Sequence, residues 1–427
     1  MGPVATAIQG KGLRGMMARA RTITSRYGLT AGKMDRILSE FVDTLREFDC
    51  GATFPITTAA LARSRGVVEK YQAQNIEFAV HGYYHVDHSQ LSLDEQISQL
   101  VKARQLFRQR GVTSDGFRCP YLRWNEDTIA AVAATAFQYD SSQGLVWDVA
   151  GDLETDTYRQ VLQFYGAVSA QAYPALPRIE GDLLRIPYCL PDDESLIDRF
   201  HLSPHQPEPN PWLAILDETY RLGELFTLGL HPERIRLCKS WLTDTLRRAR
   251  TLSPHVWITR LDEAARWWRA RLDTRIVVTS QDNAILRLQT EGPDGLAILA
   301  RGVVCHSPTE IWDGHSRLAD GTELTFSSPI RPFIGVPPAS DPALSSFLRQ
   351  QGYIVETASG PGEHAFFLDR PQFGARDERP LLAEIEDGDR PLVRLGRWPH
   401  GARSALVVTG DIDALTLWDY GLRALGN

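Results

Sequence analysis

An alternation of short apolar runs with helical stretches, from about residue 30 to residue 270, most constrains what this chain can fold into. Between Met34 and Phe48, apolar residues recur at spacings of three and four, which predicts a helix with one buried face. Strand-like runs follow at residues 52–57, 76–81, 116–120, 138–142, 183–188 and 225–231. Alternating strands and helices form parallel sheets or barrels, with functional groups at the carboxyl ends of the strands. The sequence therefore predicts an α/β fold.

The pattern changes after about residue 273. Runs rich in β-branched residues are separated by turn signals such as "PDG" and "ADG", and one helical stretch, "DPALSSFLRQQG", interrupts them. A barrel-type apolar strand returns only near the end of the chain, in "ALVVTGDID". We therefore expect three parts: the main α/β part over residues 1–272, a smaller α+β module over 273–395, and a closing strand and helix over 396–427.

Charge and composition exclude several classes of protein. The net charge of −7 argues against a nucleic-acid or anionic-membrane binder, whose surface would be basic. No apolar run reaches the roughly 20 residues of a membrane span, and the first residues lack the apolar core of a secretory signal. The five cysteines are scattered without a CxxC spacing, which is typical of reduced thiols. These features predict a cytoplasmic protein.

The stretch "VHGYYHVDH" places histidines at the end of a predicted strand. His81 and His85 are four residues apart, so a helical conformation would put both imidazoles on one face, within reach of one metal ion. His88 is the weaker third candidate. A lone histidine is more often a satisfied core or surface residue, so the pair carries the hypothesis.

The closing strand ends on two acids, Asp411 and Asp413. Because strand side chains alternate, both would project to the same side if the extended conformation continued through them. One carboxylate could then bind a metal while the other accepts a proton from water. The alternative is that the two acids cap the helix that follows.

Two further strand ends carry reactive side chains. In "FRCPYLRWN", Pro120 stiffens the turn after a strand and Arg118 could grip a carboxylate, although a surface arginine is the alternative. In "TLGLHPE", His231 closes an apolar strand and could protonate a leaving amine, or could simply cap a helix. Four such endings in one alternating pattern are harder to ascribe to chance than any single one.

Together these motifs resemble the polysaccharide deacetylases, the NodB-homology group also called carbohydrate esterase family 4. The resemblance is carried by "ATFP" from Ala52, HGYYH from His81, RCPY from Arg118, "YDSS" with Asp140, and "GLH" ending at His231. It covers roughly residues 20–270 and the last thirty or so. It implies a distorted (β/α) barrel with an Asp–His–His metal site, into which the 273–395 module is inserted.

The order of the motifs departs from the family pattern, because the acid pair that should come first comes last. A circular permutation would explain this, with the final strand folding back into the barrel. A second, truncated barrel or a site completed by swapping between the subunits of a homo-oligomer are the alternatives. We favour permutation, because no other acid pair in residues 1–50 follows an apolar strand.

The resemblance also implies roles for individual residues. Asp413, His81 and His85 would hold a divalent ion, with zinc favoured by two imidazoles and one carboxylate. Asp411 would be the general base, oriented by Arg118.

Supporting and substrate-contacting groups follow from the same resemblance. Asp140 would brace Arg118, the backbone N–H of Tyr121 would stabilise the oxyanion, and His231 would protonate the departing amine. Leu230 or Trp147 would wall a pocket for the acetyl methyl group, and Trp124 would contact the substrate.

The function implied is a metal-dependent hydrolase that removes an N-acetyl, or less readily an O-acetyl, group from a carbohydrate substrate. Hydrolysis of a cyclic amide on the same fold is one alternative. A glycosyltransferase with a metal-binding DxD motif is the alternative from a different class, but it would not need the HxxxH, RxPY and Leu–His motifs.

Overall fold

The computed structural model describes residues 24, 26–149, 156–200, 202, 210–282 and 285–422. The first residues, on which the expected lack of a secretory signal depends, lie outside these ranges. Within them, no helix is both long and apolar enough to cross a membrane.

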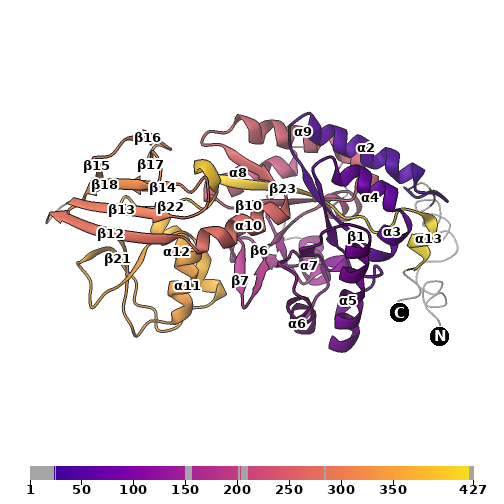
Figure 1. Cartoon of the computed structure of the whole chain (residues 1–427), viewed down its shortest axis with the longest axis horizontal. Coiled ribbons are helices and arrows are strands. Elements are labelled where there is room, and N and C mark those ends of the chain that lie inside the picture. The colour runs from indigo at the N-terminus through magenta and orange to yellow at the C-terminus, as the bar shows by residue number, and fades with distance from the viewer. Residues whose placement is uncertain are drawn as a thin grey trace.

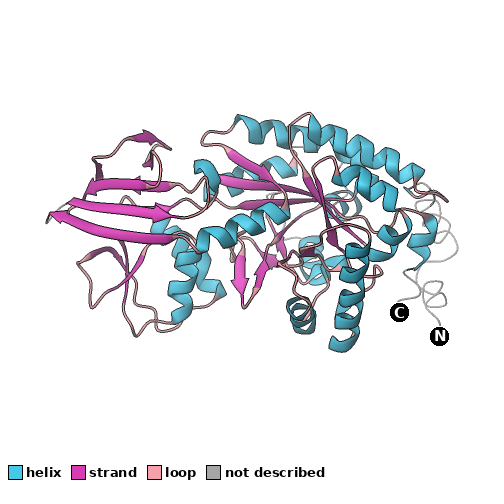
Figure 2. Ribbon diagram, in the orientation of Figure 1, coloured by secondary structure: helices cyan, strands magenta, loops and turns pink. Residues whose placement is uncertain are grey.

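Most strands of the larger part join one curled, mainly parallel sheet that forms half of a barrel (Figure 2). Its order is β6-β5-β9-β10-β23-β1-β2-β3-β4-β8-β7, and β11 pairs with β23 beside this path. Among the described residues the outer strands β6 and β7 do not pair with each other, so the sheet stays open. The predicted α/β fold is confirmed. The strands are β1 (Ala52–Ile56), β2 (Ile76–Val80), β3 (Gly116–Phe117), β4 (Tyr139–Asp140), β5 (Gly144–Val146), β6 (Val168–Ser169), β7 (Arg178–Glu180), β8 (Leu183–Arg185), β9 (Tyr188–Leu190), β10 (Leu225–Leu230), β11 (Val256–Thr259) and β23 (Ser404–Gly410).

Helices cover the outer face of this sheet (Figure 2). The apolar periodicity after residue 30 becomes α2, whose Met34, Leu38, Phe41 and Leu45 are buried. A capping box opens α5, since the Ser92 hydroxyl accepts from the backbone N–H of Glu95. The helices are α2 (Gly32–Arg46), α3 (Thr58–Arg63), α4 (Arg65–Gln72), α5 (Leu93–Gln109), α6 (Glu126–Ala134), α7 (Asp156–Tyr165), α8 (Pro211–Leu222), α9 (Ile235–Thr251) and α10 (Leu261–Leu272).

The last strand of the chain, β23, lies in the middle of the sheet. It runs parallel to β10, β11 and β1, and all seven of its residues are buried. A strand that is apolar on both faces is stable only where helices and strands cover both faces, so its composition demands a central position. Its carboxyl end leads to Thr416, which bridges to Gly28 just before α2.

Residues 273–395, called here the accessory module, build three smaller sheets at the end of the molecule opposite α2 and α3 (Figure 1). Their core is continuous with the larger part: one apolar cluster joins Leu225, Trp268 and Ala405 to Ile298 and Leu395. The module therefore packs against the amino ends of β10 and β23. Its sheets are β12 (Arg275–Asp282), β13 (Ile285–Glu291), β18 (Glu323–Ser327) and β15 (Val304–Cys305); β16 (Thr309–Ile311), β17 (Ser316–Ala319), β14 (Ile298–Arg301) and β22 (Leu392–Leu395); and β20 (Val355–Thr357), β19 (Arg331–Val336) and β21 (His364–Phe367), with helices α11 (Pro342–Gln350) and α12 (Glu378–Glu386).

Candidate metal and acid–base site

The HxxxH motif lies in a loop that follows β2, so the helical conformation considered from its spacing is wrong. Gly82 turns the chain with a φ of 74°, and a Cβ at this position would lie 2.8 Å from the Tyr84 carbonyl oxygen. This left-handed turn is open to glycine at little cost and folds the loop back on itself. The imidazole rings of His81 and His85 consequently lie with centroids 5.0 Å apart.

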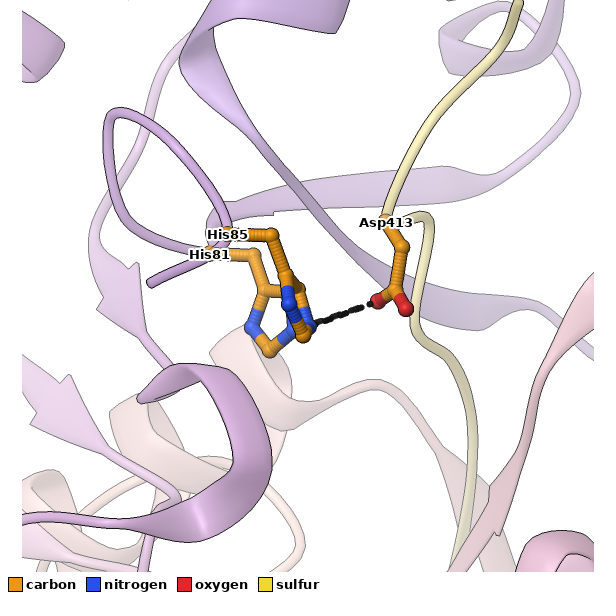
Figure 3. A group of neighbouring side chains, drawn as sticks. All are labelled: His81, His85 and Asp413. Carbon is orange, nitrogen blue, oxygen red and sulfur yellow. Dashed lines mark ion pairs between the residues drawn. The ribbon is translucent and has the colours of Figure 1, made fainter. Parts of the chain in front are cut away.

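The two histidines meet Asp413 from the opposite end of the sequence (Figure 3). The Asp413 Oδ1 atom lies 3.5 Å from Nε2 of His81 and 3.0 Å from Nε2 of His85. The Nδ1 atom of His81 lies 2.9 Å from the Arg118 carbonyl oxygen. A carbonyl can only accept, so this contact assigns the proton to Nδ1 and leaves the Nε2 lone pair facing Asp413. Two imidazoles and one carboxylate in this arrangement fit a divalent cation.

The extended conformation of β23 continues past its last ladder residue. The backbone N–H of Ile412 donates to the Pro55 carbonyl at 2.7 Å, and the Thr57 N–H donates to the Ile412 carbonyl at 3.3 Å. Asp411 and Asp413 therefore line the same cavity, as strand alternation predicts. The helix-capping alternative is wrong, because the side chain of Thr416 caps the following helix, α13 (Leu417–Gly421).

The side chain of Arg118 fixes the Asp411 carboxylate. Its guanidinium is fully buried, donates to Asp411 Oδ1 at 2.6 Å, and lies 4.6 Å from the centre of the Tyr188 ring. Its other N–H groups donate to the Thr409 hydroxyl and to the carbonyl and hydroxyl oxygens of Ser141, all within 3.0 Å. The carboxylate of Asp411 is thereby fixed in orientation.

The predicted contact of Asp140 with Arg118 is wrong. The Asp140 carboxylate accepts from Nε of Arg185 at 2.8 Å and from the Ser142 hydroxyl. Neighbouring residues of an extended chain point to opposite sides, so Ser141 reaches Arg118 while Asp140 faces away from it.

His231 is paired with an acid that the sequence reasoning missed. Its Nδ1 atom lies 2.8 Å from Asp193 Oδ1, and its backbone N–H donates to Asp193 Oδ2. Burial alone would lower the pKa of His231, but the carboxylates of Asp193, Asp413 and Glu233 raise that pKa well above its usual value. The only sequence signal was the run of acids in "PDDES" after an apolar strand.

Asp192, Asp193 and His231 also lie close enough to share an ion. The protein itself satisfies these atoms: Asp192 accepts from the Tyr188 hydroxyl at 3.1 Å and from the Ser195 N–H, and Asp193 binds His231. We therefore read this group as support for a protonated His231 rather than as a second metal site.

The reactive groups share one cavity of about 320 Å³. Its lining includes His81, His85, His231, Asp411 and Asp413, with Leu122, Phe164, Tyr165 and Tyr188 as apolar and aromatic walls. Tyr121, at a φ of 59°, packs its ring edge-on against His85 with 4.2 Å between centroids. The predicted role of its backbone N–H stays a prediction.

Three predicted substrate contacts lie elsewhere among the described residues. Leu230 is buried in the apolar core, because His231, the next residue of the extended chain, takes the cavity side. Trp147 is likewise buried in that core. Trp124 lines a different cavity, where the Arg185 guanidinium lies 4.4 Å from its ring centre. The assignment of these three side chains to the acetyl and substrate pocket is therefore wrong.

One family model agrees with the prediction made from the motifs. The family model described as polysaccharide deacetylase matches residues 29–139. No curated protein matches the sequence. Similar solved structures include a Mycobacterium smegmatis protein described as a polysaccharide deacetylase (19% identity, 58% of this chain and 81% of that chain, TM-score 0.40). A Pseudomonas aeruginosa PAO1 protein described as a probable polysaccharide deacetylase (18%, 55% and 73%, 0.41) and Puue allantoinase (18%, 55% and 72%, 0.43) also match.

The segment matched by the family model contains the "ATFP" strand and the HGYYH and RCPY motifs, but ends before β10 and β23. This segment of the chain, residues 29–139, is therefore similar to the polysaccharide deacetylases.

Proposed function

We propose that this chain is a metal-dependent deacetylase that hydrolyses the N-acetyl group of an amino-sugar-containing substrate. The observation that carries the proposal is the convergence of His81, His85 and Asp413 beside an oriented carboxylate, Asp411, in one cavity. The match of residues 29–139 to the polysaccharide deacetylase family model supports the substrate class.

His81, His85 and Asp413 would hold the ion, for which zinc is the favoured metal with two imidazole ligands and one carboxylate. When bound, such an ion lowers the pKa of water and polarises a carbonyl oxygen. The protein's own part is to orient the reacting groups. Arg118 points Asp411 into the cavity to take a proton from water, and His231, paired with Asp193, donates a proton to the departing nitrogen.

We propose that the late acid pair reflects a circular permutation of the deacetylase fold. The parallel pairing of β23 with both β1 and β10 supports this, because the strand occupies an interior position of the sheet. A second, truncated barrel or a site completed by swapping between subunits would not require β23 to lie inside the sheet of its own chain.

Acetate release from N-acetylated sugars tests the activity directly. We expect a purified, zinc-loaded protein to release acetate from at least one such substrate, and chelation to stop the release. Ring opening of cyclic amides without acetate release would instead favour the cyclic-amide alternative. Transfer of a sugar from a nucleotide donor would favour the glycosyltransferase.

An Asp411→Asn variant should retain its metal and lose turnover. The amide keeps the shape and can still contact Arg118, but it cannot accept a proton from water, so we expect kcat to fall by about 10²–10⁴. Metal content by mass spectrometry and kcat for acetate release check this. The matched Asp413→Asn variant, two residues away, should lose metal as well. An Asp411→Asn protein with normal kcat contradicts the base assignment.

An Asp193→Asn variant should move the alkaline limb of the pH–rate profile to lower pH. The Asp193 carboxylate favours the protonated imidazole, and so it raises the pKa of His231. Without it, His231 loses its proton at lower pH and the acid form disappears earlier as pH rises. The profile of kcat against pH measures the shift. A limb that stays in place, with normal kcat, excludes His231 as the acid.

A further inference from the structure

A second cavity, of about 480 Å³, lies where the accessory module meets the amino ends of two sheet strands. Its walls include Gly223 and Glu224, just before β10, and Ala402 and Arg403, just before β23. β14, α12 and β22 of the module close the other side. The six residues of β10 alone span about 20 Å, so this cavity and the metal site lie at opposite ends of the sheet.

The lining is rich in arginine. Arg379 pairs with Glu224 through both terminal nitrogens, Arg403 pairs with Asp313, and Arg221 pairs with Glu218. The other three lining arginines, Arg301, Arg394 and Arg397, surround one carboxylate; we call them the arginine cluster.

The acidic partner of the arginine cluster is the carboxylate of Glu386. Its oxygens lie 3.0 Å from Arg397 Nη2 and 3.6 Å from Arg394 Nη2. Burial would raise the pKa of Glu386, but Arg394 and Arg397 lower it to about 2, so the carboxylate is ionised. The terminal N–H groups of Arg301 donate to the backbone carbonyls of Ile385 and Glu386, each at 2.8 Å. Three guanidinium groups and one carboxylate leave two positive charges.

A fourth guanidinium, that of Arg271, is close enough to feel the charges of Arg394 and Arg397 but does not line the cavity. Its residue is 2% exposed, and burial together with the like charges of Arg397 and Arg394 lowers its pKa to about 9. Within the described residues, Nε of Arg397 and both Nε and Nη1 of Arg271 have no hydrogen-bond partner. Buried cations with unsatisfied N–H groups are costly. These three nitrogens have no surface that a ligand could reach, but an anion beside Arg394 and Arg397 would offset the repulsion among the guanidinium groups. The lining acids Asp387 and Asp389 are exposed to solvent, where their effect is screened.

We propose that this cavity binds a phosphate-bearing small molecule, with the phosphate held by Arg394 and Arg397. Two net positive charges match a dianion, and guanidinium groups suit phosphate through paired N–H donors. The volume exceeds that of a bare phosphate and lies in the usual range of small-molecule sites. Leu299, Leu382 and Trp312 offer an apolar wall for the organic part.

Calorimetric titration of the intact, metal-loaded chain with inorganic phosphate and with inorganic pyrophosphate tests the site. We expect saturable binding of one anion per chain that weakens with added salt. Arg397→Gln and Arg394→Gln should each weaken it at least about tenfold, since each removes a charge-assisted hydrogen bond. Because the metal site could also attract phosphate, the Asp413→Ala protein is titrated in parallel and should bind the anion equally well.

Two further variants separate binding from misfolding. Glu386→Gln removes the competing carboxylate and should tighten phosphate binding, a gain that a misfolded protein cannot produce. Arg331→Gln removes another module arginine, paired with Glu356 outside the cavity, and should change nothing. The proposal is overturned by absence of saturable binding, by binding that is lost in Asp413→Ala, or by affinities that neither Arg397→Gln nor Glu386→Gln alters.

Discussion

An Asp413→Ala variant is expected to lose both its bound metal and its turnover. The change removes the only carboxylate within 3.5 Å of the two Nε2 atoms among the described residues, leaving two imidazoles to hold the ion. A bound ion supplies several kcal/mol of transition-state stabilisation, so we expect kcat for acetate release to fall by about a thousandfold or more. Metal content after dialysis and kcat with excess zinc are the two measurements.

The fold should survive this change, because Asp413 is partly exposed and ends no ladder. Circular dichroism and the melting temperature of the metal-free proteins should therefore match the parent. A variant that keeps stoichiometric, tightly bound metal, or that turns over normally, refutes the assignment of the ligand. Asp87→Ala is a matched control, since this acid lies two residues beyond His85 and pairs with Arg123 instead.

Deleting residues 400–427 is expected to prevent folding, whereas moving the end of the chain to its beginning is not. The deletion removes β23, whose Leu406, Val407 and Val408 are fully buried. Burying these three side chains contributes roughly 5–9 kcal/mol, which is comparable to the whole stability of a typical domain. Solubility, circular dichroism and protease resistance measure the loss.

The compensating rearrangement begins the chain at Gly388, in the exposed loop after α12, and runs to Leu422. A flexible linker of about ten Gly and Ser residues, spanning about 17 Å, then leads to Thr24 and onward to Asp387. The junction is short, because the rings of Tyr27 and Tyr420 lie 5.5 Å apart between centroids. We expect this rearranged chain to fold, bind one metal ion and release acetate like the parent.

The deletion and the rearrangement together test the permutation. A deleted chain that stays folded and active contradicts the place of β23 in the site. A rearranged chain that folds but binds no metal contradicts the claim that the late strand acts as a displaced first strand. If two variants that are inactive alone regain activity when they are mixed, the swapped alternative is favoured.

Much of the site was predictable because its parts end apolar strands. His81, Asp411, Asp413 and His231 each follow such a run, and local alternation shows where a buried strand stops. The conformation of the HGYYH loop was not predictable from spacing. The left-handed turn at Gly82 brings the histidines together, whereas a helix would have done so through its periodicity.

The supporting residues were less predictable. Asp140 and Ser141 are neighbours in one motif, and which of them reaches Arg118 depends on the face that each presents to the adjacent strand. Asp193 lies in a helical turn shortly after β9, and its partner His231 is 38 residues away. Leu230 and Trp147 lie in the apolar core. An apolar residue near a motif can occupy either face of a sheet, and the sequence does not determine which.

The sequence by itself determined the elements and the chemistry at their ends, because hydrophobic periodicity and strand-end side chains are encoded locally. The order of the strands was decided only by the tertiary structure. β23 lies between β1 and β10 because a strand that is apolar on both faces gains most of its stability from neighbours distant in sequence. That packing carries Asp411 and Asp413 to the histidines, and the same junction gathers the arginine cluster at the opposite end of the sheet.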